Sequence, residues 1–313
     1  MRPAFSVIFL TTLIGAGQGL FLALVAVELL ARAGAIAGPA DARWHVAGAA
    51  ASLGLLGLGL LASFFHLGRP ERAWRAAARW RTSWLSREVI ALPTFMAAVA
   101  AYGAAHHFAW PWTVPLGLAG VAACAALFAC TGMIYACLRF LQEWSSPFTI
   151  ANFALMGTAS GFMLAAPLAD LFAPRLAPGL AGAALVLTAT ALASRLASLR
   201  RNRRLRPKST PQSATGLRGP RVVQKSMGFM GGSFNTREFF HGASREKVAA
   251  IRRIALGAGF VAPMAVAAAG LAAGSWLVLA GAFVIQYAGL VAERWYFFAE
   301  ANHPQNIYYQ CIA

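Results

Sequence analysis

Long uncharged stretches of Ala, Leu, Gly, Phe and Val alternate along the chain with short segments that are rich in arginine. Each stretch is close to the ~20 residues that a helix needs to cross the hydrocarbon core of a bilayer. The stretches lack the period-2 alternation of barrel strands, so they predict helices. The predicted spans cover residues of about 5–31, 45–66, 88–109, 112–138, 148–170, 177–199, 252–272 and 275–298.

Composition supports this pattern, because 59% of the 313 residues are hydrophobic and only 12% are charged. A soluble domain is therefore excluded. We expect an all-α fold, with residues 1–313 forming a single membrane domain of eight transmembrane helices. The first apolar stretch is too long for the core of a cleavable signal peptide, so it is expected to remain as the first span.

The basic residues predict the orientation of the chain. If successive spans cross the membrane in opposite directions, all but three of the 27 Lys and Arg residues lie on one side of it. The exceptions are Arg32, Arg43 and Arg175. Cytoplasmic loops are enriched in Lys and Arg, so this side and both termini are predicted to be cytoplasmic. The net charge of +17 is then a topology signal, and nucleic acid is not expected as a partner.

The longest connector, residues 200–247, is predicted to be a basic cytoplasmic loop. Its first part, RRNRRLRPKSTPQSATGLRGPR, is poor in apolar residues and suits contact with lipid headgroups. Its second part, MGFMGGSFNTREFFHG, places Phe, Met and Gly beside Arg237, Glu238 and His241. This second part is expected to fold against the membrane face.

Cysteine and histidine positions argue against bound metal in this chain. The four cysteines form no Cys-x-x-Cys pair and no cluster with histidine, so neither an iron–sulfur cluster nor a zinc site is expected. A haem held between helices needs facing histidines near mid-membrane. All six histidines lie instead at predicted span ends or beyond them: His45, His106 and His107 on one side, and His66, His241 and His303 on the other.

Polar residues within or beside the spans are the remaining candidates for function. Gln18 lies inside the first span, where an interhelical hydrogen bond is expected and a path for a substrate or a proton is the alternative. The surrounding GAGQG and the later GLLGLG are expected to permit close helix packing. Glu28 and Arg32, four residues apart, are expected to form a helical ion pair.

The connector SFFHLGRPERAWRAAARWRTSWLSRE, residues 63–88, concentrates charge at the predicted cytoplasmic face. His66 and Glu88 lie at the ends of the spans that it joins. A quinone suits such a place, because its reduction needs a titratable group at the carbonyl oxygen and apolar walls around the ring. The structural alternative is that the arginines set the orientation and that Glu88 pairs with them.

Three stretches, FFHLGRPERAWRA…RTSWLSRE, TREFFHG and ERWYFFAEANHPQNIYYQ, resemble the membrane anchor subunits of the dimethyl sulfoxide reductase family. The opening PAFSVIFLTTLIGAGQGLFLAL resembles especially the anchor of the cytoplasmic sulfite dehydrogenase (quinone) branch. The resemblance implies a haem-free anchor in the bacterial inner membrane. Its implied partners are a molybdopterin catalytic subunit and an iron–sulfur subunit with four [4Fe–4S] clusters.

The same resemblance implies the site residues. The family's quinone-site candidates match His66, Arg72 and Glu88, and Arg69 lies beside them. On this hypothesis, electrons pass to ubiquinone or menaquinone during sulfite oxidation. His66 exchanges a proton with the quinone, Arg72 holds a quinone oxygen or tunes His66, and Glu88 exchanges protons with the cytoplasm. Further residues are expected to support partner docking or to contact the site residues from behind without touching the quinone: Arg237, Glu238, His241, Glu293 and Arg294.

Three alternatives stay open at the level of sequence. The first is the anchor of a dimethyl sulfoxide reductase-type complex that oxidises menaquinol. The second is a transporter with a path along Gln18, Glu28 and Asp170, although the sequence has no internal repeat of the kind that many transporters carry. The third is a purely structural anchor without a quinone site.

Overall fold

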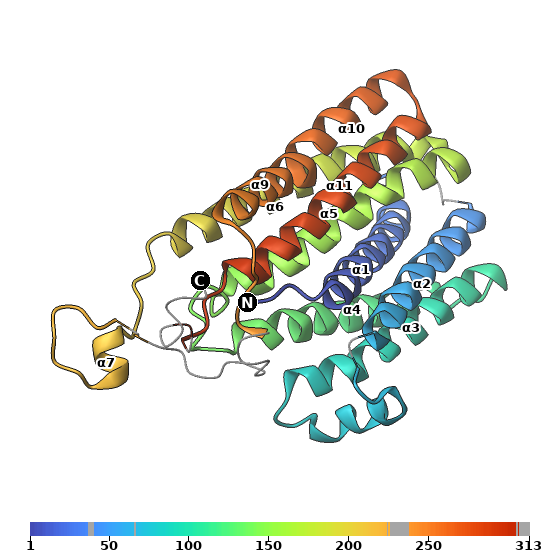
Figure 1. Ribbon diagram of the computed structural model, residues 1–313. Helices are drawn as coiled ribbons and strands as arrows, with labels where there is room; N and C mark the ends of the chain where they lie inside the picture. Colours follow the sequence, from blue (N-terminus) through green and yellow to red (C-terminus); the bar gives the residue numbers. More distant parts are fainter. Residues whose placement is uncertain (37–40, 66, 224, 226–237, 305, 307–313) are drawn as a thin grey trace.

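The computed structural model (Figure 1) describes all residues except 37–40, 66, 224, 226–237, 305 and 307–313. All secondary structure in the described residues is helical. The elements are α1 (Phe5–Arg32), α2 (Ala42–Phe64), η1 (Pro70–Arg79), α3 (Trp84–His107), α4 (Thr113–Ala136), α5 (Pro147–Phe172), η2 (Pro174–Leu176), α6 (Ala177–Asn202), α7 (Pro211–Thr215), α9 (Arg245–Leu256), η3 (Gly257–Val261), α10 (Ala262–Ala273) and α11 (Trp276–Glu300).

Within the described residues, eight helical segments are long and apolar enough to cross a membrane, and α9, η3 and α10 together form one of them. The predicted all-α fold and the predicted number of spans are confirmed. The third span begins at Trp84, before the predicted residue 88, and the seventh begins at Arg245, before residue 252. In both cases a serine cap starts the helix earlier than the apolar pattern does, because Ser83 and Ser244 accept backbone hydrogen bonds in the first turn.

Helix α1 is the centre of the bundle and packs against α2, α4, α5 and α11. Its crossing with α5 is close, because a Cβ atom on Gly161 of α5 would overlap the backbone of Gly19. This confirms the expected packing role of the glycines around Gln18. The expectation was wrong for Gly54 and Gly57 of α2, which have open space beside them.

The seventh span contains a wide turn where α9 meets α10. Residues Gly257–Val261 form a π-helical turn, and Pro263, which has no N–H to donate, is the second residue after it. Here Gly259 lies against the backbone of Gly289 in α11, at a distance that leaves no room for a Cβ atom on Gly289. The turn thus lets the seventh span approach α11 closely.

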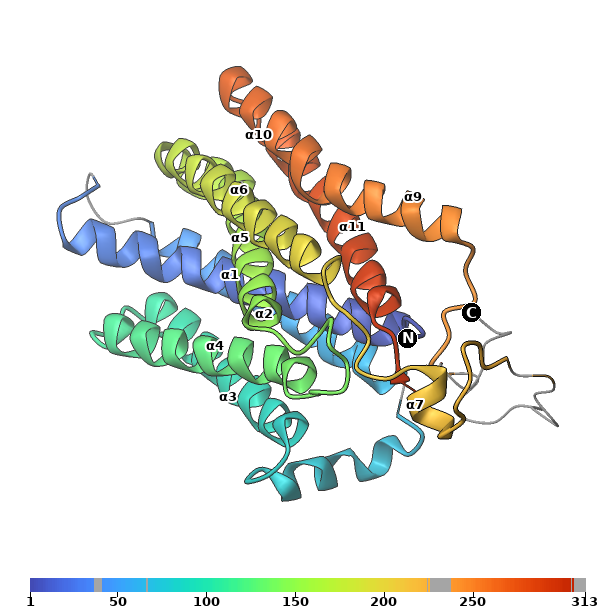
Figure 2. The same ribbon diagram turned by 90° about the vertical axis from the view of Figure 1, so that its left-hand side faces the viewer.

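The N-terminus, η1, α7 and the end of α11 lie at one end of the bundle (Figures 1 and 2), which we call the basic end. The backbone N–H of Arg2 donates to the carbonyl of Glu238 at 3.0 Å, and the amine of Met1 donates to the carbonyl of Ala301 at 2.8 Å. Trp144 Nε1 donates to the carbonyl of Phe297 at 3.0 Å. These bonds tie the terminus, the long connector and the α4–α5 connector to the end of α11.

Candidate functional site

Glu88 is buried at the basic end, on the second turn of α3. Its side chain lies inside the bundle, with the residue only 8% exposed, and its Oε1 accepts a hydrogen bond of 2.5 Å from the hydroxyl of Thr131 on α4. Ionisable groups at membrane depth are costly and usually mark a path or a binding site. The structural alternative was that Glu88 pairs with the arginines of the connector. None of these arginines, all of which the structure describes, forms an ion pair with its carboxylate, so this pairing is wrong.

A groove opens beside Glu88 between α1, α2, η1 and α3. Its volume is about 270 Å³, and Glu88 is the one ionisable residue among the described residues that line it. The walls are otherwise apolar apart from a single serine: Leu10, Leu60, Ser63, Phe64, Leu67, Ala73, Trp74, Ala76, Leu85, Val89, Leu92 and Pro93. An apolar cavity with one convergent polar group is the usual form of a site for a small organic ligand.

The connector between α2 and α3 covers one side of this groove, but its arginines point elsewhere. Arg69 and Arg72 are exposed, and Arg72 Nε lies 3.8 Å from a carboxylate oxygen of Glu71. Neither of these arginines lines the groove, whereas Trp74 does. The predicted His66 lies outside the described residues, so its role remains a prediction.

Arg87 fixes the shape of this connector. Its guanidinium donates to the carbonyls of Trp80 and Arg81, both at 2.8 Å, and stacks over the ring of Trp84 at 4.1 Å. A guanidinium in such an arrangement satisfies carbonyls that a short irregular connector would leave unpaired. This arginine therefore has a structural role.

A small void lies behind Glu88, on the side away from the groove. Its volume is about 10 Å³, close to the least that holds one water molecule, and Gln18, Glu88 and Thr131 are among its lining residues. Gln18 Nε2 donates to the carbonyl of Cys124 at 3.0 Å. The interhelical hydrogen bond expected of Gln18 is confirmed, and its position also brings it near Glu88.

A chain of buried ions links α6 to α11 at the basic end. Arg195 lies 2.9 Å from Glu293 and 3.3 Å from Glu300, and Glu293 lies 3.5 Å from Arg294. The guanidinium of Arg294 stacks on the ring of Phe153 at 3.7 Å. Glu293 and Arg294 are thus buried within the protein. Sequence reasoning missed the link through Arg195 and Glu300, although Glu293 and Glu300 are seven residues apart on one helix face.

A second buried polar cluster occupies the opposite end of the bundle. Glu28 accepts hydrogen bonds from Thr113 at 2.6 Å and Tyr102 at 2.9 Å, and it lies 3.4 Å from His106 Nε2. The His45 ring stacks on His106 with centroids 4.0 Å apart. The expected ion pair with Arg32 is confirmed at 3.3 Å, but it is one contact of several around this carboxylate.

An apolar layer separates this cluster from the groove. Between Gln18 and Glu28, α1 buries Phe21, Leu24 and Val25, each 2% exposed or less. The edge of Phe21 meets Phe95 at a centroid distance of 5.4 Å. The two polar regions are therefore separate sites.

The predicted residues of the long connector lie apart from the groove. Glu238 is exposed, while His241 Nδ1 accepts from the backbone of Ala243 at 3.1 Å and faces a different cavity. Burial lowers the pKa of His241, and the nearby N-terminal amine lowers it further. Arg237 lies outside the described residues. The structure thus brings Glu88 alone, of the described candidates, into the groove.

Comparison with known proteins places these features in context. Residues 1–214 match the family model described as DMSO reductase anchor subunit (DmsC). The chain is 53% identical over 326 aligned positions to a subunit of the sulfite dehydrogenase of Allochromatium vinosum, and the alignment covers 100% of both proteins. The match to the family model includes η1, Glu88 and Thr131.

Proposed function

Because the chain belongs to the DMSO reductase anchor subunit (DmsC) family, we propose that it is the haem-free, quinone-reactive subunit of a molybdopterin oxidoreductase in the bacterial inner membrane. An anchor of this family acts in a complex with catalytic and iron–sulfur subunits. The chain then exchanges electrons between the iron–sulfur subunit and the quinone pool. The name of the relative favours sulfite oxidation as the source of the electrons.

The observation that carries this proposal is the buried Glu88 at the floor of the apolar groove. The residues present fit a quinone, because the ring needs apolar and aromatic walls, which Leu60, Phe64 and Trp74 supply. A bound quinone supplies two-electron chemistry that consumes or releases two protons. Glu88 would hold or release a proton at its carboxylate beside a quinone oxygen, and Thr131 would keep that carboxylate in place.

The connector residues have supporting roles in this proposal. His66, which lies outside the described residues, follows α2 in the sequence and is the second proposed proton-exchanging group. Arg69 directly precedes η1 and Arg72 lies in its first turn, both exposed, and they are proposed as further ligands of a quinone oxygen.

The charge distribution favours one side of the membrane for this reaction. Loops at the basic end hold nearly all the Lys and Arg residues, which predicts that this end is cytoplasmic. The groove and the proposed docking face for the iron–sulfur subunit are then on the same side. This arrangement suits a cytoplasmic catalytic subunit, as in sulfite oxidation.

The test is the purified complex with Glu88→Gln in the anchor. Sulfite-dependent quinone reduction should fall by about 10²-fold or more, while sulfite oxidation with an artificial soluble acceptor should stay unchanged. The matched control is Glu246→Gln, because Glu246 is exposed in the first turn of α9 and does not line the groove. Quinone reduction at the wild-type rate in Glu88→Gln would refute the proposed site. A complex that oxidises menaquinol with a sulfoxide, and does not respond to sulfite, would assign the chain to the reductase type.

A further inference from the structure

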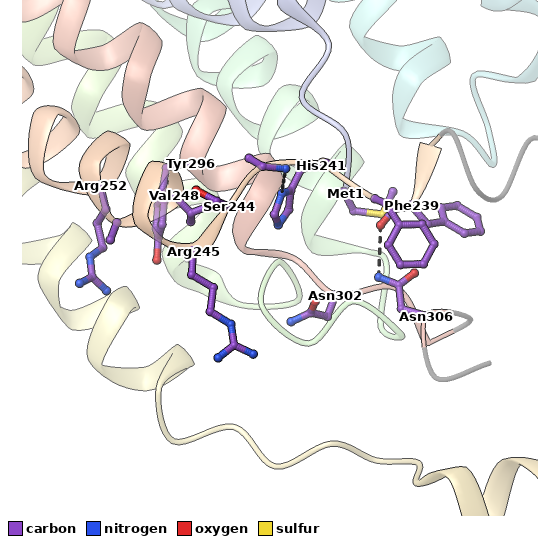
Figure 3. Close-up of a pocket in the computed structure, with 14 residues that line it drawn as sticks. Met1, Phe239, His241, Ser244, Arg245, Val248, Arg252, Tyr296, Asn302 and Asn306 are labelled. Carbon is purple, nitrogen blue, oxygen red and sulfur yellow. Dashed lines mark hydrogen bonds between the residues drawn. The ribbon is translucent and has the colours of Figure 1, made fainter. Parts of the chain in front are cut away.

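A large basic cavity lies at the basic end, well apart from the groove of Glu88. It has a volume of about 830 Å³ and is bounded by α9, the end of α11 and the segment that precedes α9 (Figure 3). Its lining includes Ser244, Arg245, Arg252, Tyr296 and Asn302. In Figure 3 the side chains of Arg245, Arg252 and Tyr296 point to the same side of α9.

The charged side chains that line this cavity are basic. Two guanidinium groups line it, and its described lining contains no Asp or Glu. His241 and Met1 also line the cavity, and the N-terminal amine adds a further positive group nearby. The first turn of α9 begins at Ser244 on the cavity wall, and the positive end of this 12-residue helix adds to the field, offset in part by Glu246 in the same turn. An anion would relieve this excess of positive charge.

The donors are arranged for an oxyanion. Arg245 and Arg252 are seven residues apart on one face of α9, which separates them by about 10.5 Å along the axis. Tyr296 of α11 lines the same cavity as Arg252. The hydroxyl of Ser244 and the amide of Asn302 are further donors at the wall. Guanidinium groups bind phosphate oxygens through paired hydrogen bonds.

The depth of the cavity indicates the source of that phosphate. The seventh span runs for 29 residues, Arg245–Ala273, whereas about 20 suffice to cross the hydrocarbon core. Counting 20 residues back from Ala273 reaches Ile254, so Arg252 lies at the boundary where lipid phosphates are found. On the same helix, Ile254 and Val261 are 54% and 55% exposed, which gives this span an apolar outer face for lipid. Figure 2 shows α9 and α10 at the edge of the bundle.

We propose that this cavity binds the phosphate headgroup of an anionic phospholipid from the leaflet at the basic end, with Arg245 and Arg252 as its principal ligands. The site would hold one lipid between α9 and the end of α11. This inference does not depend on quinone chemistry, because the cavity and the groove of Glu88 share no lining residue among those that the structure describes.

The test measures lipid retention by the complex in nanodiscs of phosphatidylcholine, with and without phosphatidylglycerol, by native mass spectrometry. The wild type should keep phosphatidylglycerol in preference to phosphatidylcholine. The double variant Arg245→Gln/Arg252→Gln should lose at least about tenfold in apparent affinity, since two charge-assisted contacts are removed. The matched control is Arg218→Gln/Arg221→Gln, which removes the same charge from exposed positions of the long connector and should leave retention unchanged.

Three results would overturn the proposal. Equal retention in the cavity variant and the control variant would show that the cavity is not the site. If added inorganic phosphate alone displaced the bound lipid, the ligand of the cavity would be a free anion. Binding by the isolated anchor but not by the complex would mean that another protein of the complex occludes the cavity. Arg252→Lys, which keeps the charge, should retain part of the affinity and so distinguishes a lost ligand from a damaged fold.

Discussion

The carboxylate of Glu88 and the hydroxyl of Thr131 are joined by a hydrogen bond of 2.5 Å across the contact of α3 and α4. Both residues are at least nine-tenths buried, and the apolar groove begins beside Glu88. A buried carboxylate keeps one orientation only if its partners do. Thr131 is therefore a positioning residue for the proposed quinone site.

Thr131→Val should lower quinone reduction without removing it. The substitution keeps the shape of the side chain but takes away a hydrogen bond to a charged group, which contributes about 1.5–3 kcal/mol. We expect a drop of about 10- to 100-fold in kcat/KM for quinone, measured in the assembled complex. Thr190→Val is the matched control, because Thr190 is exposed on α6 and bonds only within its own helix. Equal losses in the two variants would argue against a specific role.

Glu28→Gln should lower stability but leave quinone reduction unchanged. Glu28 is held by Thr113, Tyr102 and Arg32, and the amide would lose the charge-assisted part of these bonds. The layer that contains Phe21 separates it from the groove. We expect a lower melting temperature in detergent, with the wild-type rate of quinone reduction at a temperature where the variant is folded. A fall in that rate would mean that the two polar regions communicate.

Sequence reasoning predicted the helices well, because the bilayer requires long apolar runs and these are visible in the chain. It also proposed Glu88 as a candidate, since an ionisable residue at a span end is conspicuous against an apolar background, and the structure places this residue beside the groove. It could not predict the partner Thr131, 43 positions away, because the contact depends on how α3 packs on α4. The cluster around Glu28 was missed for the same reason: its members come from four helix ends and meet only in the folded bundle.

Arg195→Met should destabilise the protein strongly. Arg195 lies between Glu293 and Glu300, so its loss leaves Glu300, whose side chain is only 13% exposed, without its guanidinium partner. Breaking a buried pair in this way typically costs about 3–5 kcal/mol. The double variant Arg195→Met/Glu300→Gln should recover part of the loss, because it removes the stranded charge as well. Thermal unfolding in detergent measures both, and identical melting temperatures for the single variant and the wild type would contradict the ion chain.

The orientation of the bundle can be read from a native thiol. Cys137 is exposed at the end of α4, on the basic side. If that side is cytoplasmic, an impermeant maleimide should label Cys137 in inverted membrane vesicles but not in intact cells with a permeabilised outer membrane. Arg43→Cys, made with Cys137 and Cys311 replaced by serine, should show the reverse, because Arg43 is exposed at the opposite end. Labelling of Cys137 in intact cells would invert the proposed topology and remove the cytoplasmic placement of the catalytic subunit.

The lowered pKa of His241 predicts a pH dependence of stability. Burial and then the N-terminal amine lower this pKa below its usual value of 6.5, so between the two values the unfolded chain binds a proton that the folded chain does not. Stability should therefore fall as the pH drops through 6.5 and level off below the folded pKa. His241→Gln should flatten this slope. Bound phosphatidylglycerol would offset the positive field around His241, so the wild-type slope should shrink in nanodiscs that contain this lipid. If His241→Gln left the slope of stability against pH unchanged, the titration would belong to another group. If the lipid left that slope unchanged, this would count against an anion in the cavity.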